Sequence, residues 1–171
     1  MKKLFFLLCL GGLGFVSCTE PNDEFDSAHS YKPLLLHQDQ LENSVTFSEK
    51  RSIARPGKIY FKDNFIYLGE RYKGVHIIDN SDVRNPQQVG FINAPGCIDM
   101  AMKGNILYID NAVDLVAIDL TDYRDPKVTE RIAGVFPEHT PPDNPIIPHE
   151  FQKEQRPENT VIIEWVSTKK R

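Results

Sequence analysis

The sequence is poor in cysteine, in clustered basic residues and in long apolar runs, and each shortage excludes a class of protein. Of its three cysteines, Cys9 lies within the apolar N-terminal run, Cys18 stands at the end of that run, and only Cys97 lies in the body of the chain. A single cysteine cannot build a disulfide framework in the folded part, which must therefore rest on a hydrophobic core. Basic residues cluster only at 169–171, and phosphate binding depends on such clusters. The sequence therefore predicts no nucleic-acid partner.

The uncharged apolar run over residues 4–16 is too short for a permanent transmembrane helix. Its 13 residues would span roughly 20 Å as a helix, whereas the hydrocarbon core of a bilayer is roughly 30 Å thick. The run follows Lys2 and Lys3. A short basic stretch before an apolar run of this length is typical of a secretory signal peptide.

The apolar run ends in Phe15-Val16-Ser17-Cys18, which resembles the lipobox of bacterial lipoproteins. The resemblance implies a signal peptide over residues 1–17, cleavage before Cys18, and acyl chains on Cys18 that insert into a lipid bilayer. Several acyl chains hold a protein on a membrane far more firmly than one. We therefore expect a lipoprotein of the cell envelope, anchored in the outer membrane and either periplasmic or surface-exposed. An ordinary secretory signal, with Cys18 incidental, is the alternative.

Composition divides the rest of the chain into three parts. They are a flexible tether and lead-in over 18–54, two repeats over 55–133 (about 57–95 and 96–133), and a proline-rich tail over 134–171. The tether begins with an acidic, turn-rich stretch. In the tail, residues 136–157 hold six prolines, which disfavour a regular helix or a central strand. Residues 160–166 after them are expected to form one strand that contains Trp165.

Self-comparison of the middle part reveals an internal repeat. Ile78-Asp79 matches Ile118-Asp119 at an offset of 40 residues, and Tyr67 matches Tyr108 at 41. The residues of the following turn recur at the same offset of 40: Asp82, Arg84 and Pro86, then Asp122, Arg124 and Pro126. Identities that recur at one offset across a whole unit indicate duplicated structural units.

Each unit is rich in Ile, Val, Tyr and Phe and has no convincing helical period, which indicates short strands. The expected strands lie near 58–62, 65–69, 74–79 and 88–92, and then near 98–102, 106–110, 114–120 and 127–132. Asp63-Asn64 and Gly104-Asn105 suit tight hairpins because these residue types tolerate positive φ. The predicted fold class is therefore all-β, with two four-stranded antiparallel units.

The segments GVHIIDNSDVRNPQQVG and DLVAIDLTDYRDPKV resemble LVIVD-repeat proteins, in which an aliphatic strand ending in Asp precedes a proline-containing turn. The resemblance covers roughly 57–133 and implies propeller-type blades, which are four-stranded units of about 40 residues. It implies no shared catalytic motif. Propellers usually have four to eight blades, so two blades leave an incomplete propeller. A capped short relative, a piece of a longer propeller, self-association that covers exposed blade faces, and a third degenerate blade from the tail all stay open.

Two sets of acidic and histidine residues are candidates for function. One set recurs with the repeat: Asp79, Asp82, Pro86, Asp119, Asp122 and Pro126. Recurrence favours a structural role in closing turns over a Ca²⁺ site, since no dense Asp-x-Asp-x-Asp spacing is present. The other set lies in the tail: His139, Asp143, His149 and Glu150. It is a weak candidate for metal binding, because the second histidine of a zinc-protease motif is missing.

Other residues give little support for catalysis. Cys97 has no Cys-x-x-Cys partner and is expected to be a small buried residue rather than a nucleophile. Tyr72 and Tyr123 lie in expected turns and are candidates for an exposed ligand surface. We expect Trp165 to pack against the repeats.

The sequence therefore predicts a non-catalytic envelope lipoprotein that works as a binding or scaffold module. No cofactor is expected. The partners expected are the lipid bilayer, through acylated Cys18, and an unidentified protein or glycan ligand. Two alternatives stay open. One is a propeller hydrolase or lactonase with a central metal, and the other is a truncated remnant of a longer repeat protein.

Overall fold

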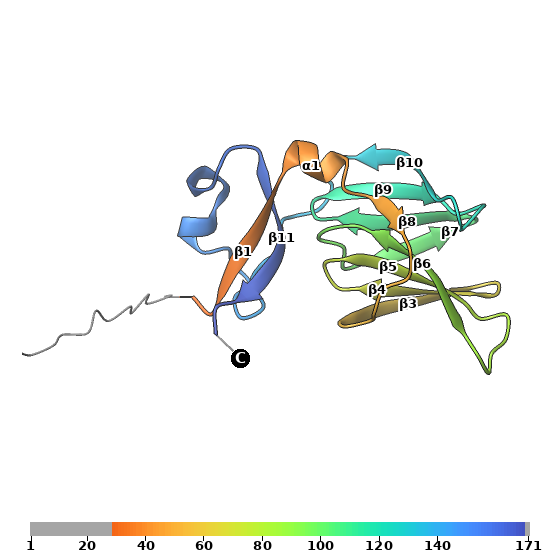
Figure 1. The fold of residues 1–171 in the computed structure, drawn as a ribbon. Helices are drawn as coiled ribbons and strands as arrows, with labels where there is room; N and C mark the ends of the chain where they lie inside the picture. The colour runs from red at the N-terminus through yellow and green to blue at the C-terminus, as the bar shows by residue number, and fades with distance from the viewer. Residues whose placement is uncertain (1–28, 170–171) are drawn as a thin grey trace, which may run out of the picture.

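The computed structural model describes residues 29–169, which form a mostly β-stranded structure (Figure 1). The all-β prediction is confirmed. The expected signal peptide and Cys18 lie outside the described residues. Within the described part of the chain, no helix is both long enough and apolar enough to cross a membrane.

The first of two large antiparallel sheets has five strands. In spatial order they are β2 (Thr46–Ser48), β6 (Gln87–Asn93), β5 (Gly74–Asp79), β4 (Phe65–Glu70) and β3 (Pro56–Lys62). The last four are consecutive in the chain and agree with the predicted strands to within two residues. The short strand β2 adds to the β6 edge, with Phe47 opposite Ile92.

The second large sheet has four strands. In spatial order they are β10 (Lys127–Ile132), β9 (Asp114–Asp119), β8 (Ile106–Asn111) and β7 (Met100–Lys103). These also agree with the predicted strands to within two residues. As in β3 to β6 of the first sheet, strands that are consecutive in the chain are neighbours in space, because short connections link them.

The two sheets share one backbone irregularity at a matching position of the repeat, while a further register shift, between Pro56 and Ile59, occurs only in the first sheet. The β5–β6 register shifts between Ile77 and Ile78, and the β9–β10 register shifts between Val128 and Glu130. Each of these two shifts is a bulge with one extra residue, Val89 in β6 and Thr129 in β10. The hairpin predictions are also confirmed, since Asp63 and Gly104 begin two-residue turns with φ of 52° and 60°.

The main hydrophobic core lies between the two large sheets. The five-stranded sheet contributes Tyr67, Val75, Ile77 and Ile92, and the four-stranded sheet contributes Leu107, Ile109, Val116 and Ile118. We call these two surfaces the inner faces. In the repeat Ile77 matches Ala117, whereas the core residue of β9 is its neighbour Ile118. Because side chains alternate along a strand, opposite faces of the two similar sheets therefore pack together.

A third sheet joins segments from the two ends of the described chain. Strand β1 (Tyr31–His37) pairs antiparallel with β11 (Thr160–Ser167). The expectation of a flexible lead-in does not hold for residues 31–48, which contain β1, the helix α1 (Gln38–Glu42) and β2. The reason is that β11 needs a partner strand, and β1 supplies it from the opposite end of the described chain. No local sequence pattern reveals such a pairing.

The two-stranded sheet lies beside the strand ends of the large sheets, and α1 connects the two parts (Figure 1). Val161 packs with Leu41 and Ala112 in a second, smaller core. Trp165 is 3% exposed and contacts the proline-rich tail. Its Nε1 donates to the carbonyl of His139 at 2.8 Å, and its ring meets Phe151 edge-on. The tail adds two short 3-10 helices, His149–Phe151 and Lys153–Gln155.

Candidate functional site

The outer face of the four-stranded sheet contains an apolar cleft of about 460 Å³. Alternation along β8 and β9 places Tyr108 and Leu115 on this face, opposite the core. Phe136, which follows β10, forms one wall of the cleft. The polar side chains at the cleft are Lys58, Asp99, Asp110 and His139. The site is therefore an apolar hollow with a polar margin, which suits binding.

This outer face, which we call the open face, has a covered counterpart in the five-stranded sheet. The open face carries Tyr108, Leu115, Ala117 and Ile132, which match Tyr67, Val75, Ile77 and Ile92 on the inner face of the five-stranded sheet. Ile92 is 1% exposed, whereas Ile132 is 50% exposed. The four-stranded sheet thus leaves open the surface that the five-stranded sheet buries.

The outer face of the five-stranded sheet is open in one half. Ile59 and Phe61 on the edge strand β3 are 67% and 61% exposed. Their counterparts in the second repeat, Met100 and Met102, pack in the main core. Each large sheet therefore exposes an apolar face that the other sheet buries in the core. The open face of the four-stranded sheet matches the inner face of the five-stranded sheet, and the outer face of the five-stranded sheet matches the inner face of the four-stranded sheet.

The other half of this outer face is covered by the segment 49–55, which crosses from β2 to β3. The amides of Ala54 and Arg55 donate to the Glu70 carboxylate at 3.1 and 2.5 Å. The Arg51 guanidinium lies 4.8 Å above the Phe91 ring. All seven residues of the segment are themselves exposed. The segment therefore forms a raised, solvent-facing layer on this half of the sheet.

A buried polar pair lies beneath this segment. Glu70 and His76 are 2% and 0% exposed, and His76 Nε2 lies 3.2 Å from Glu70 Oε2. Burial by itself would raise the pKa of Glu70, but the Ala54 and Arg55 amides and His76 lower it below its ordinary value. Burial lowers the pKa of His76, although the Glu70 carboxylate opposes this effect. Because Gln88 Nε2 contacts Nδ1 of His76, both ring nitrogens have partners.

The groups around the cleft are held in fixed positions by the loop that precedes β7. Asp110 accepts hydrogen bonds from the amides of Ile98 and Asp99, each at 2.8 Å. Burial nevertheless raises the pKa of Asp110 above its ordinary value. Cys97 is 2% exposed, and burial raises the pKa of its thiol well above the ordinary value. A buried thiol with a raised pKa is a poor nucleophile, because only the thiolate reacts. His139 Nε2 lies 2.7 Å from the Gly96 carbonyl.

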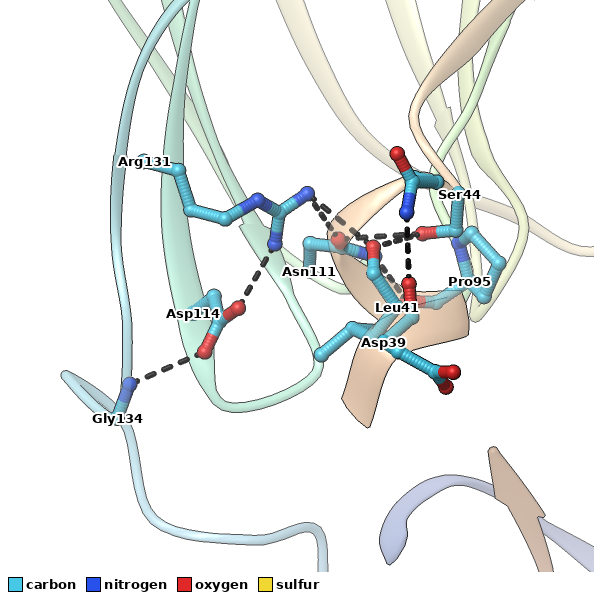
Figure 2. A network of polar contacts seen from close by, with 9 residues as sticks. Asp39, Leu41, Ser44, Pro95, Asn111, Asp114, Arg131 and Gly134 are labelled. Atoms are coloured by element: carbon cyan, nitrogen blue, oxygen red, sulfur yellow. Dashed lines mark hydrogen bonds and ion pairs between the residues drawn. The ribbon is translucent and has the colours of Figure 1, made fainter. Parts of the chain in front are cut away.

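A buried polar network anchors α1 to the end of the four-stranded sheet (Figure 2). Arg131 forms an ion pair with Asp114 at 2.8 Å, and its other terminal nitrogen donates to Asn111 Oδ1 at 2.9 Å. Asn111 Nδ2 donates to the Pro95 carbonyl at 2.7 Å, and Arg131 also reaches the Leu41 carbonyl at 3.3 Å. Removing one partner of such a buried pair typically costs about 3–5 kcal/mol. The network is internally satisfied, so we interpret it as a structural anchor rather than a ligand site.

The recurring aspartates lie in the turns that follow β5 and β9. Asp79 accepts a hydrogen bond from the Ser81 amide, and Asp119 accepts one from the Thr121 amide, both at 2.8 Å. Hydrogen bonds from Ser81 and Thr121 lower the pKa values of these two carboxyls. Farther along, Asp82 and Asp122 each accept a hydrogen bond at 3.0 Å from the amide two residues later. Pro86 and Pro126 follow in the same turns.

The four tail residues considered for metal binding are not brought together. Within residues 29–169, no group of three or more His, Cys, Asp or Glu side chains is arranged to hold a metal ion. His139 contacts Gly96 and the Tyr72 ring, and Glu150 lies 3.4 Å from His29. Asp143 and His149 lie elsewhere in the tail, Asp143 beside a small polar pocket and His149 at the start of a 3-10 helix.

The two candidate tyrosines lie at opposite ends of the strands. Tyr72 is in the β4–β5 turn with φ of 63°, and its ring meets the His139 ring edge-on. Tyr123 is in the β9–β10 turn and packs against Phe65 at 4.7 Å between the ring centroids. They therefore do not form one surface. Cys18, the candidate site of lipid attachment, lies outside the described residues.

Sequence reasoning missed the buried polar residues at the ends of β4 and β8. Glu70 and Asn111 occupy matching positions of the repeat and are only 2% and 0% exposed. Both bind the segment that precedes the repeats, Glu70 through the amides of Ala54 and Arg55 and Asn111 through Ser44. The sequence feature that could have revealed these residues is a polar residue that recurs at the end of an aliphatic strand. Its binding partners were not predictable, because they come from a segment with no repeat.

Comparison of the chain with protein-family models, with curated proteins and with solved structures gave no match. The LVIVD resemblance therefore rests on the strand and turn residues of the sequence alone.

Proposed function

We propose that this protein is a non-catalytic lipoprotein of the cell envelope that acts as a scaffold for protein binding. Its two large sheets would act as propeller-type blades, and the open face of the four-stranded sheet would bind the partner. The observation that carries the proposal is the exposure of this face, with its cleft, while the corresponding face of the five-stranded sheet forms the core.

The chemistry of the partner follows from what covers the corresponding face inside the molecule. The five-stranded sheet is covered by Leu107, Ile109, Val116 and Ile118. A surface shaped like the inner face of one sheet suits another β-sheet that presents branched aliphatic side chains. A protein partner of this kind fits better than a glycan, because glycans lack a continuous aliphatic surface.

The proposed location rests on the lipobox residues that end at Cys18. Full-length chain produced in a bacterial host should incorporate labelled palmitate and fractionate with the envelope. The Cys18→Ser variant should lose the label and leave the membrane fraction. Equal labelling of both proteins would overturn the lipid anchor but would leave the binding surface unaffected.

Photo-crosslinking in intact cells tests the binding surface. A photoreactive amino acid at Ile132 lies on the open face, and the same group at Val83 lies in the β5–β6 turn, away from it. Val83 is 74% exposed and Ile132 is 50% exposed, so random collisions favour Val83. We expect a discrete crosslinked protein product from position 132 and none from position 83. Equal products at both positions, or none at 132, would contradict the proposal.

A further inference from the structure

We propose that the partner on the open face of the four-stranded sheet is a second copy of this chain, which docks through the outer face of its five-stranded sheet. The inference rests on the proposed function, because it names the partner of the same surface. Each copy would then offer its open face to one neighbour and the outer face of its five-stranded sheet to the other neighbour, so that the copies would be arranged head to tail.

The interface inside the molecule supplies the template for this contact. In the main core, Met100, Leu107 and Ile118 of the four-stranded sheet face Tyr67, Ile77 and Ile92 of the five-stranded sheet. In the assembly, each of these residues would be replaced by its counterpart in the other repeat. One copy would therefore present Ile59, Ile66 and Ile78, and the next copy would present Tyr108, Ala117 and Ile132.

The exposures fit this arrangement. Ile59 and Phe61 on one surface and Ile132 on the other are each at least half exposed. Ile66 and Ile78 beside them are half-buried, as are Tyr108 and Leu115 on the open face, where the small side chain of Ala117 is buried. Large apolar side chains grouped in this way on a folded protein mark an interaction surface more often than isolated ones do.

The shapes of the two surfaces also correspond. The segment 49–55 stands above the half of the five-stranded sheet that holds Glu70 at its strand end. The cleft in the four-stranded sheet lies over the half that holds Asp110, near the end of β8. This end of β8 matches the end of β4, where Glu70 lies. The raised segment of one copy would therefore enter the hollow of the next. Ile53, which is 45% exposed at the centre of the segment, would enter the apolar part of the cleft.

Charge agrees with shape. The segment carries three exposed basic residues, Lys50, Arg51 and Arg55, and one exposed acid, Glu49. The open face carries the exposed Glu130 on β10. Within the cleft, Lys58 forms an ion pair with Asp99, and Asp110 accepts hydrogen bonds from two backbone amides. Opposite charges on the margins of an apolar contact set its register and suppress wrong partners.

The contact is heterologous, so copies add in one direction until a ring closes or a filament grows. Propellers usually close with about four to eight blades, so a closed ring with two blades per chain would contain about two to four chains. The ring would leave neither apolar surface exposed.

Sedimentation of the purified full chain, in detergent of matched density, tests the assembly. We expect the unmodified chain to sediment as a closed oligomer. Ile132→Arg alters the open face and Ile59→Arg alters the opposite surface. Each change should reduce the chain to a monomer, because each removes one side of every contact. Val83→Arg, at an exposed apolar residue in a turn, should leave the oligomer intact.

Mixing the two disabled variants gives the decisive result. The Ile132→Arg chain keeps an intact outer face on its five-stranded sheet, and the Ile59→Arg chain keeps an intact open face. An equimolar mixture should form a heterodimer with one contact and no larger species. A circular dichroism spectrum identical to that of the unmodified chain shows that both variants fold.

Three outcomes would overturn the inference. The first is sedimentation of the unmodified chain as a monomer at all concentrations tested. The second is an intact oligomer of Ile59→Arg, which would indicate two open faces packed together. The third is a mixture that remains monomeric. If position 132 still crosslinks to a different protein in cells while the pure chain is monomeric, the proposed function stands and the self-assembly fails.

Discussion

The five-stranded and four-stranded sheets share the order of four strands and one bulge, yet they differ in which faces are covered. Ile92 and Ile132 occupy matching positions on β6 and β10, and their exposed fractions are 1% and 50%. The backbone of each sheet follows from its own residues. Whether a face is buried depends on the segments that pack against it. The same apolar positions of the repeat therefore form the core in the first sheet and lie on the surface of the second.

The largest expected effect compares these two isoleucines. Ile92→Ala removes a side chain from the main core and should lower the free energy of unfolding by about 2–5 kcal/mol. Ile132→Ala removes a half-exposed side chain and should change the free energy of unfolding by less than about 0.5 kcal/mol. Urea unfolding, at a chain concentration low enough that the midpoint no longer depends on it, measures both. Similar losses in the two variants would show that the open face is covered within a single chain.

An intermediate effect concerns His76, whose counterpart in the four-stranded sheet is Val116. Folding lowers the pKa of His76 because the side chain is buried, so the unfolded chain binds the proton more tightly. Stability is therefore full above the pKa of an unfolded histidine, about 6.5, and is lost as the pH falls towards the lower pKa of the folded state. We expect the urea midpoint to fall on acidification below about pH 6.5, and His76→Val to remove that part of the slope.

A matched control for this pH effect is His149→Gln, since His149 is exposed at the start of a 3-10 helix. This variant should keep the slope of the unmodified chain. The continuing loss at lower pH should persist in His76→Val, because Glu70 still accepts hydrogen bonds from the Ala54 and Arg55 amides and its pKa is lowered. An unchanged slope in His76→Val would contradict the assignment to His76.

The smallest expected effect tests the similarity between the turns that follow β5 and β9. Asp79→Ala and Asp119→Ala each remove the acceptor for one turn amide, that of Ser81 or Thr121. The two turns share this amide bond, while Asp119 also accepts a hydrogen bond from Thr121 Oγ1 at 2.6 Å. Both variants should therefore lower the melting temperature slightly, and Asp119→Ala should lower it somewhat more. Asp125→Ala removes only an exposed pair with Lys127 and should have no measurable effect. A larger effect of Asp79→Ala than of Asp119→Ala would contradict this comparison of the two turns.

The candidate site was predictable in part. The predicted strand ranges imply that Tyr108 and Leu115 lie on one face of the second unit, because side chains alternate along a strand. The presence of only two predicted units implied that some sheet faces would have no partner. The exposure of Ile59 and Phe61 on β3 was not predictable, because large apolar residues in a strand are normally expected to be buried. Tyr72 and Tyr123 were expected on a ligand surface, yet the fold places them at opposite strand ends, where they contact His139 and Phe65.

The sequence by itself determined the local structure of residues 56–132. Strand ranges, hairpin positions and turn hydrogen bonds depend on residues close together in the chain, and the internal repeat makes each of them visible twice. Only the tertiary structure decided what covers each sheet. The pairing of β1 with β11, the crossing of segment 49–55 over Glu70 and the anchoring of α1 by Arg131 join residues far apart in sequence. Such contacts depend on which surfaces remain free after the local units have formed, and no local pattern records that.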